Sequence, residues 1–283
     1  MEDVSDAFLS GVSQMLVSED KKFNYKDNNL KDYSIIELIS DGAKYKCWVT
    51  DGTYKYLYKE SKKHVSGEFT KEHISEYLAY VLCTEIGLSC ARVILKENAI
   101  LSRVESDADL RTFTELSEEF PDSFHMSNLS TFNISSLLSR EFNPYLSDVI
   151  NMLLFDALIG NSDRHPNNFM YDGENFYPLF DNGSSLCSYI EEDSIKDYLK
   201  DSMRFKALCE SKSKPVLRDE QKLTHKELVE IISRMFPIEY SNFSQKLKRL
   251  DINKVLSSVE LSDDRYALLS NFLRYRLEWF KEI

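Results

Sequence analysis

Two short polar stretches constrain this chain more than any other feature of its sequence. Residues 160–168 read GNSDRHPNN and follow an apolar segment, and residues 178–183 read PLFDNG. Strand-forming residues on both sides of an Asp-Gly pair lie between the two stretches, which predicts a β-hairpin. Because a hairpin returns the chain to nearly where it left, Asn168 and Asp181 are expected to face one cation. Magnesium, which binds a few carboxylate or amide oxygens together with phosphates, suits such a pair.

The position of Asp163 adds a second constraint. It stands five positions before Asn168, which is the spacing of the protein-kinase catalytic loop, where the aspartate orients the attacking hydroxyl and the asparagine holds magnesium. We therefore assign Asp163 and Asn168 as catalytic residues, and Asn168 and Asp181 as metal ligands. Ordinary turn chemistry would explain either stretch alone, but the two together favour the catalytic interpretation.

These residues also carry a family resemblance. Residues 160–168 followed by residues 178–183 resemble the HipA-like serine/threonine kinases of bacteria, including the short CtkA-like and HipT-like members. The Asp-Arg-His-x-x-Asn core is also similar to that of phosphatidylinositol kinases. The resemblance covers roughly residues 35–283 and is sharpest from 155 to 186. It implies an ATP-dependent kinase acting on protein serine or threonine, with autophosphorylation, a toxin or effector role and an antitoxin-like partner as further expectations.

Composition limits the other functions that the chain could have. Its 283 residues carry a formal net charge of −12, which argues against direct nucleic-acid binding. Five cysteines without a CxxC pair indicate neither a disulfide framework nor a zinc site. The N-terminus is acidic and no apolar run is long enough to span a membrane. A cytoplasmic protein is expected, and secretion by a route that needs no signal peptide stays open.

The N-terminal third predicts an antiparallel sheet with a phosphate-binding loop. Strands are expected over 34–39, 45–49 and 54–59, because alternating apolar residues are separated by turn-forming ones. The loop over 40–46 could offer backbone N–H groups to ATP phosphates, and we assign Ser40, Gly42 and Lys44 to this site. The resemblance implies an autophosphorylated serine in this loop. Asp41 stands at that position, which leaves Ser40 as the nearest hydroxyl.

Lys59 and Glu76 are the other expected ATP-site residues. Lys59 shares a strand face with Leu57 and could reach the α- and β-phosphates; a solvated surface lysine is the alternative. A helix over 72–88 carries Glu76, which the resemblance pairs with Lys59, with Glu72 as the second choice. A hairpin over 90–104 then leads into the hinge that binds adenine through its main chain. We assign Leu101 and Arg103 to this contact.

The sequence of the C-terminal two thirds predicts a mostly helical structure. Apolar residues at helical spacing predict helices over 145–159, after Thr224 and after Ser262, while residues 184–218 are expected to form a loop that corresponds to an activation segment. His165 is assigned to the catalytic loop, either as a structural brace or, as the second choice, in proton transfer. Arg164 is expected to pair with a carboxylate or a phosphate.

The sequence therefore predicts an α+β, two-lobed, protein-kinase-like fold. Residues 1–104 would form the N-terminal lobe, with an antiparallel sheet and one helix, and residues 105–283 a mostly helical C-terminal lobe. ATP and Mg²⁺ would bind between them. Two alternatives stay open. One is a lipid or small-molecule kinase, and the other is a pseudokinase or interaction module that binds nucleotide without turnover.

Overall fold

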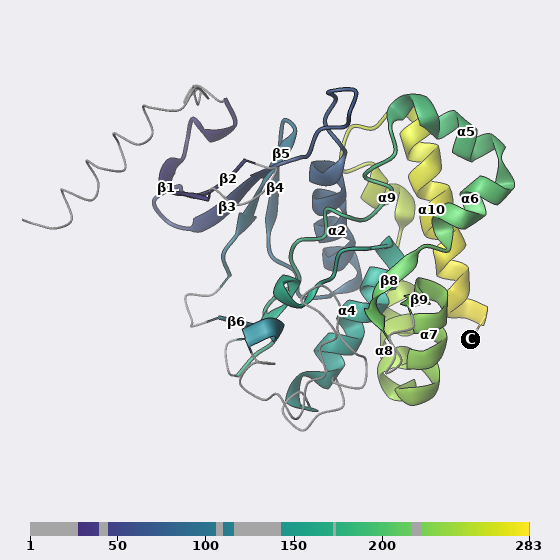
Figure 1. The fold of residues 1–283 in the computed structure, drawn as a ribbon. Helices are drawn as coiled ribbons and strands as arrows, with labels where there is room; N and C mark the ends of the chain where they lie inside the picture. Colours follow the sequence, from purple (N-terminus) through teal and green to yellow (C-terminus); the bar gives the residue numbers. More distant parts are fainter. Residues whose placement is uncertain are drawn as a thin grey trace, which may run out of the picture.

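An antiparallel sheet and a mostly helical part make up the described molecule, a computed structural model (Figure 1). The structure describes residues 28–39, 45–105, 110–115, 143–171, 174–216 and 222–282. The predicted α+β kinase-like architecture is confirmed. The loop residues Ser40, Gly42 and Lys44, assigned to the phosphate site, lie outside the described part of the chain.

The sheet has five antiparallel strands in the order β1-β2-β3-β5-β4. Their bounds are β1 (Ser34–Ile39), β2 (Lys46–Thr50), β3 (Lys55–Glu60), β4 (Val93–Lys96) and β5 (Ala99–Arg103), so the predicted strands are confirmed. The turn between β2 and β3 follows from its sequence, because Asp51 accepts hydrogen bonds from the N–H groups of Thr53 and Tyr54, at 2.8 Å each. Gly52 has a φ of 88°, which favours glycine.

The two faces of the central strands have different surroundings. Tyr58 lies opposite Leu101, and both are buried in a small cluster with Cys47, Val49 and Tyr56. Since neighbours along a strand point to opposite faces, Leu57 and Lys59 lie on the other face, as predicted. That face is directed at the cavity described below.

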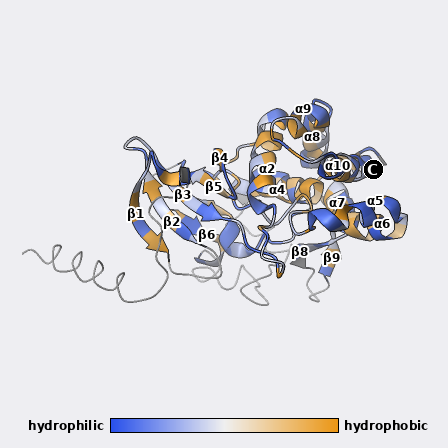
Figure 2. Ribbon diagram, turned by 90° about the horizontal axis from the view of Figure 1, so that it is seen from above, coloured by the Kyte–Doolittle hydropathy of each residue, from blue (hydrophilic) through white to orange (hydrophobic). Residues whose placement is uncertain are grey.

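Helix α2 (Glu72–Ile86) connects the sheet to the helical part. It ends at Gly87, which has a φ of 68°, and its residues Leu78, Leu82 and Ile86 belong to the same continuous core as the C-terminal helices. Figure 2 shows hydrophobic residues concentrated along α2 and α4, whereas α5 and α6 at the edge are largely hydrophilic. Helix α2 is therefore packed into the larger hydrophobic core.

The helical part is arranged around the buried helix α4. Its elements are η3 (Asn143–Tyr145), α4 (Leu146–Ile159), α7 (His225–Met235), α8 (Pro237–Leu247), α9 (Ile252–Leu256) and α10 (Asp263–Glu282). Thr224 caps α7 through a capping box with Glu227. Within the described residues, no helix is both long and apolar enough to cross a membrane.

The region predicted as a loop over 184–218 contains regular structure, so that prediction was wrong. It holds η5 (Glu192–Ser194), α5 (Ile195–Lys200), α6 (Ser202–Cys209) and β8 (Lys212–Val216), and β8 pairs with β9 (Lys222–Thr224). Asp201 caps α6 by accepting hydrogen bonds from two main-chain N–H groups. Since only Ile195 and Cys209 of the two helices are buried, these elements have no apolar stripe to reveal them.

The segment predicted to be catalytic forms the expected loop and hairpin. Helix α4 ends at Gly160, and η4 (Pro166–Asn168) closes the loop before the short strand β7 (Met170–Tyr171). Tyr171 bridges to Phe176, and the N–H of Tyr177 donates to the carbonyl of Met170 at 2.9 Å, which forms the expected hairpin. The strand β7 also pairs with β6 (Arg111–Thr112).

Gly160 offers a test of how tightly this segment packs. Its φ is 69°, and a Cβ there would lie 2.8 Å from a ring carbon of Phe272. We expect Gly160→Ala to lower the free energy of unfolding by about 2 kcal/mol or more, because backbone strain and overpacking add. Gly87→Ala is the matched control, with a φ of 68° and no atom within 4 Å of the added Cβ. Equal losses for the two variants in urea denaturation would contradict this packing.

His225 predicts a pH dependence of stability. Burial holds its pKa well below the ordinary value, and the charge of Arg276 acts in the same direction. Below about pH 6.5 the unfolded chain therefore binds a proton that the folded chain does not, so stability is lost as pH falls. We expect wild-type stability to drop by about 1 kcal/mol relative to His225→Leu between pH 7.5 and 5.5. A pH-independent difference between their thermal unfolding curves would show that the ring is not buried in its neutral form.

Candidate active site

The buried side chain of Arg164 connects the segments that form the candidate active site. Its side chain is 1% exposed, and each of its five N–H groups has an acceptor. Nε and one Nη2 hydrogen donate to the carboxylate of Asp156 at 2.9 and 3.0 Å. The other donors reach the carbonyls of Asn168 and Phe180, at 2.7 Å each, and the amide oxygen of Asn182 at 2.5 Å. One guanidinium therefore joins helix α4, the loop over residues 160–168 and the segment around Asp181.

The acceptor for this guanidinium is prepared by helix α4. Asp156 is buried one turn before the helix ends, where Asn161 donates to its carboxylate at 3.0 Å. The amide oxygen of Asn161 in turn accepts from the N–H of Asp163 at 2.9 Å. Because a buried ion pair is stable only when its remaining polar atoms are bonded, this network sets the backbone of the loop that carries Asp163.

Asp163 lies at the surface of this loop. Its carbonyl accepts from the amide nitrogen of Asn168 at 2.8 Å and from the N–H of His165 at 2.8 Å. Its carboxylate is 44% exposed and lies 3.4 Å from the ammonium of Lys214 on β8. The main chain of Asp163 is therefore fixed, while its side chain stays accessible to solvent.

Asn168 presents an amide oxygen to the site. The residue is buried, and its amide nitrogen is engaged by the carbonyl of Asp163. Among the described residues no hydrogen-bond donor contacts its amide oxygen, which is the atom that binds cations.

Asp181 pairs directly with Lys59 across the two parts of the molecule. Asp181 has a φ of 53°, in the left-handed region. Burial alone would lower the pKa of Lys59, but the charges of Asp181, Glu76 and Glu72 outweigh it and raise that pKa. Lys59 is therefore a fully charged ammonium on the inner face of β3.

Glu76 does not form the expected ion pair with Lys59 among the described residues. Its carboxylate instead accepts from the N–H of Asn182 at 2.9 Å. Burial raises the pKa of Glu76, and the charge of Lys59 opposes this shift. Glu72, the second choice, accepts from the N–H of Lys62 and the hydroxyl of Tyr189, at 2.9 Å each. Both glutamates therefore hold main chain around the site.

Gly183 lies where helix α2 meets the segment after Asp181. A Cβ at Gly183 would be 3.2 Å from a carboxylate oxygen of Glu76 and 3.3 Å from the carbonyl of Glu72. The absence of a side chain therefore allows the close approach that brings the N–H of Asn182 to Glu76.

His165 braces the loop in this structure. Its Nδ1 accepts from the N–H of Asn167 at 3.3 Å, and it caps η4 with Pro166 at the first position. Burial lowers the pKa of His165, against the opposing charges of Asp163 and Asp181. This geometry fits the structural brace, and the imidazole is neutral near pH 7.

A mainly apolar cavity of about 390 Å³ adjoins these groups. The sheet lines one side of it and the helical part the other. Its lining residues are Trp48, Lys55, Leu57, Ala91, Ser102, Arg103, Val104, Leu110, Met170, Tyr177 and Phe180. Phe180 precedes Asp181, and Leu57 shares the strand face of Lys59, so the cavity opens beside the charged groups.

The two residues assigned to adenine have different positions. Arg103 lines the cavity and forms a two-point ion pair with Glu105. The side chain of Leu101 is fully buried on the opposite face of the sheet, next to Tyr58. Leu101 also pairs with Tyr58 on one side and Ile94 on the other, so its main chain lies inside the sheet.

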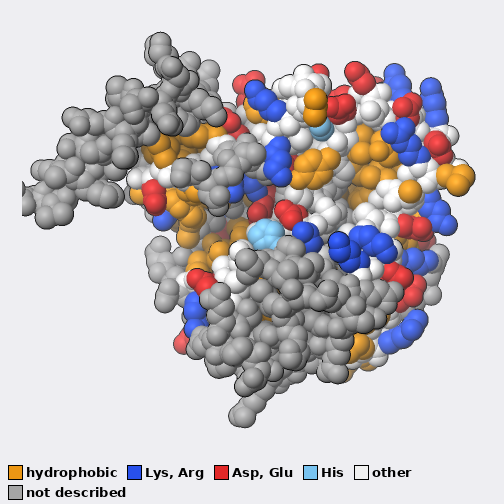
Figure 3. Space-filling model, viewed as in Figure 1, with side chains coloured by type: hydrophobic (Ala, Val, Ile, Leu, Met, Phe, Trp, Pro, Cys, Tyr) orange, Lys and Arg blue, Asp and Glu red, His pale blue; other side chains and the backbone are white. Residues whose placement is uncertain are grey.

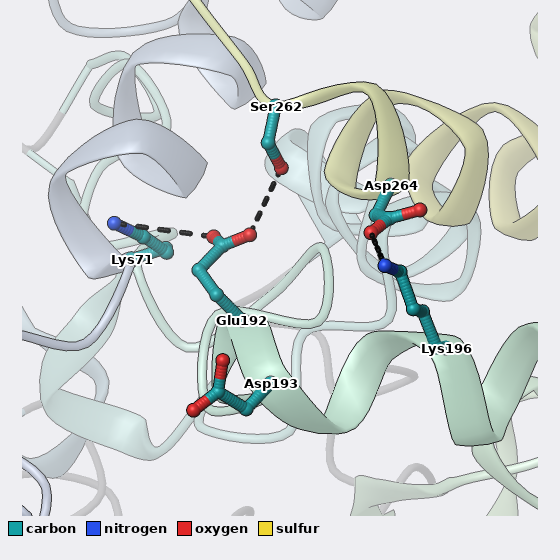
Figure 4. Close-up of a pocket in the computed structure, with 6 residues that line it drawn as sticks. All are labelled: Lys71, Glu192, Asp193, Lys196, Ser262 and Asp264. Atoms are coloured by element: carbon teal, nitrogen blue, oxygen red, sulfur yellow. Dashed lines mark hydrogen bonds and ion pairs between the residues drawn. The ribbon is translucent and has the colours of Figure 1, made fainter.

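A second cavity, of about 530 Å³, lies apart from this site (Figure 4). Its wall contains Glu192, which accepts from the hydroxyl of Ser262 at 2.9 Å and from Arg265 at 3.0 Å, while the ammonium of Lys71 lies 3.9 Å away. Figure 4 shows Lys196 facing Asp264, 3.6 Å apart. These pairs connect the start of α2 to α10, which helps to fix the helix that carries Glu76.

Several of these contacts were missed from the sequence. The sequence did not indicate these contacts for four residues, which look like ordinary loop or helix residues: Lys214, Asp156, Asn161 and Asn182. The Asp-Asn-Gly sequence could have indicated that the residue after Asp181 is structural, because asparagine often bonds nearby main chain in turns. In Figure 3 some acidic, basic and histidine side chains lie between the sheet and the helical part, while many other charged side chains are spread over the helical part.

Comparison with solved structures places this geometry in a known fold. The crystal structure of the Helicobacter pylori proinflammatory kinase CtkA superposes with a TM-score of 0.71 at 17% identity, over 88% of this chain and 95% of that chain. HipA of Shewanella oneidensis MR-1, solved with HipB and operator DNA, gives a TM-score of 0.52 at 13% identity, over 96% of this chain and 70% of that chain. No family model and no curated protein sequence matches the chain. The chain therefore has the fold of CtkA and HipA, in agreement with the resemblance seen in its sequence.

Proposed function

We propose that this protein is a kinase that transfers the γ-phosphate of ATP to a serine or threonine hydroxyl of another protein. The observation that carries the proposal is the convergence of Asp163, Asn168 and Asp181 beside the cavity, in segments that the buried guanidinium of Arg164 joins. Lys59 completes this set from the sheet. The fold similarity to two kinases supports the same conclusion.

The cavity suits the adenine of ATP. Leu57, Met170 and Phe180 offer apolar surface on both sides of it, as expected for a small-molecule site with few polar contacts. Lys59 lies on the same strand face as Leu57, so its ammonium would bind phosphates of a nucleotide whose base occupies the cavity.

The donor set fits magnesium. Among the described residues there is no group of three or more histidine, cysteine, aspartate or glutamate side chains that could hold a metal on its own. Magnesium does not need such a cage, because it binds one or two protein oxygens together with substrate phosphates. Asn168 and Asp181 would hold the ion, which would supply positive charge to the phosphate oxygens.

The remaining residues carry the transfer. Asp163 would orient the acceptor hydroxyl and take its proton as the hydroxyl oxygen bonds to the γ-phosphorus. The bond from that phosphorus to the bridging oxygen breaks, and ADP leaves with the electron pair. This reaction needs positioning and charge neutralisation more than covalent help, which is what a rigid loop with an accessible carboxylate provides.

A protein acceptor is favoured over an anionic lipid by the net charge of −12, which disfavours approach to a negative membrane surface. The HipA structure contains HipB, and on that likeness we also propose an antitoxin-like protein partner. ATP is plentiful in the cytoplasm, and the five cysteines are free, so we propose that the enzyme works there or in the cytoplasm of a target cell.

Phosphate transfer from labelled ATP with Mg²⁺ tests this proposal. We expect Asp163→Asn to lower the rate by about 100-fold or more, because general base catalysis contributes that much. Asp193→Asn, an exposed aspartate at the second cavity, is the control and should retain the wild-type rate.

The acceptors in this assay should include a generic protein, the protein itself and phosphoinositide vesicles. Label on protein, located by mass spectrometry, supports the protein kinase. Label on lipid alone would instead identify a lipid kinase. Binding of ATP without transfer to any acceptor would identify a nucleotide-binding module.

Arg164→Lys tests the buried centre of the site. A lysine cannot reproduce five directed donors, so we expect a loss of several kcal/mol in stability and at least a 100-fold lower transfer rate where the variant is still folded. Arg265→Lys is the control. It too is a buried arginine, but it holds the carbonyls of Cys187 and Ile190 outside the site. We expect this control to lose stability while the folded protein keeps most activity. An active Arg164→Lys variant would contradict the role assigned to Arg164.

A further inference from the structure

Lys214 places a positive charge against Asp163. It lies on β8, in the region that the sequence suggested to be a loop, and its ammonium is 3.4 Å from a carboxylate oxygen of Asp163. Its side chain is 26% exposed, so the ammonium and the carboxylate of Asp163 both lie at the surface, at one opening between the sheet and the helical part. Figure 3 shows lysine and arginine side chains gathered over β8 and β9 beside this opening.

The position of Lys214 is fixed by its neighbours on β8 and by the pairing of β8 with β9. The neighbouring Ser213 is buried, and its hydroxyl donates to the carbonyl of Leu223 on β9 at 3.1 Å. Ser213 is buried whereas the side chain of Lys214 is partly exposed, so the two neighbours point to different surroundings. The pairing of Lys212 with Thr224 and of Val216 with Lys222 fixes the strand at both ends.

A second buried arginine fixes β8 relative to the catalytic loop. Arg276 of α10 donates to the hydroxyl of Ser211 at 2.9 Å and also to the carbonyl of Ala157 in α4. Its guanidinium lies over the rings of Phe272 and Trp279, 4.6 and 4.9 Å from their centres. One side chain therefore holds Ser211, which directly precedes β8, and the helix that leads to Asp163.

The other described cations of the site have different tasks. Arg164 is buried and uses all five donors on protein oxygens. Lys59 pairs with Asp181 on the sheet side, and the lowered pKa of His165 leaves its ring neutral near pH 7. Lys214 is the cation that the described residues place on the side of Asp163 where an acceptor hydroxyl would approach.

Negative charge on the transferred phosphoryl group creates a need for such a cation. In phosphoryl transfer the charge is spread over three equatorial oxygens, and fixed positive groups aimed at them accelerate the reaction. A hydroxyl bonded to Asp163 at about 2.6–3.2 Å would bring the transferring group within reach of the Lys214 ammonium.

We propose that Lys214 is a catalytic residue that donates hydrogen bonds to the transferring phosphoryl group. This inference rests on the proposed kinase function. In the reaction the acceptor oxygen bonds to the γ-phosphorus, its proton goes to Asp163 and ADP leaves with the electrons of the broken bond. Lys214 exchanges its contact with Asp163 for the phosphoryl oxygens, and it gives up no proton.

An inhibitory role of the Lys214–Asp163 ion pair would predict a change of the transfer rate in the opposite direction. If the Lys214–Asp163 pair only blocks the acceptor site, its removal frees the carboxylate and raises the transfer rate. The sign of the change therefore separates a catalytic lysine from an inhibitory contact.

The test compares Lys214→Met, Lys214→Arg and Lys212→Met with the wild type. Lys212 is the matched control, because it lies on the same strand, two residues before Lys214, but is exposed and donates to the carbonyl of Lys222 at 3.3 Å. The measurements are kcat with saturating ATP and protein acceptor, and ATP affinity by calorimetry.

We expect Lys214→Met to lower kcat by about 100-fold, the usual loss for one transition-state donor, with ATP affinity within about twofold of the wild type. Lys214→Arg should recover part of the rate because it keeps the charge, and Lys212→Met should match the wild type. Circular dichroism establishes that each variant is folded.

Each outcome decides the proposal. A kcat for Lys214→Met that equals or exceeds the wild-type value overturns it while leaving the kinase function intact. An equal loss in Lys212→Met also overturns it, because the effect would then belong to the charge of the whole strand. If the wild type transfers phosphate to no acceptor, the proposed function fails and the role of Lys214 fails with it.

Discussion

The hydrogen bonds of the Arg164 guanidinium are the interaction on which the rest of the site depends. All five donors are satisfied in a position with almost no exposure to solvent. An unpaired charge at such depth would cost several kcal/mol, so the acceptors must all be in place when the protein is folded. Those acceptors belong to helix α4, the loop over residues 160–168 and the segment after β7. The requirement to satisfy one cation therefore brings three distant segments to fixed relative positions.

Two further buried arginines extend the same principle across the helical part. Arg276 joins Ala157 to Ser211, and Arg265 joins α10 to the carbonyls of Cys187 and Ile190 and to Glu192. Together with Arg164 they are the largest fully buried side chains of the described residues. Main-chain oxygens of irregular segments need donors when they are buried, and a guanidinium can supply several at once. The irregular segments around the site are thus held by arginines that come from, or reach into, regular helices.

The sequence predicted the parts of this arrangement that depend on local pattern. The alternation of residue types predicted strands β2 and β3 and the strand face on which Lys59 lies. The spacing of Asp163, Asn168 and Asp181 predicted a loop and a hairpin, and these bring the three residues together. It could not predict contacts made by packing. Glu76 bonds the N–H of Asn182, and Leu101 is in the sheet core, because strand register and helix placement decide those positions. Likewise α5, α6 and β8 have no apolar stripe, and Lys214 meets Asp163 only through the placement of β8.

Calorimetric titration with ATP, in the presence of Mg²⁺ and in EDTA, tests the central claim most directly. That claim is that Lys59, Asn168 and Asp181 form one nucleotide and metal site beside the cavity. The account predicts that Mg²⁺ tightens ATP binding by about tenfold or more, equivalent to about 1.4 kcal/mol, and that Asp181→Asn removes most of this gain in a folded protein. Equal affinity with and without Mg²⁺ in the wild type, or a full Mg²⁺ effect in Asp181→Asn, would contradict it.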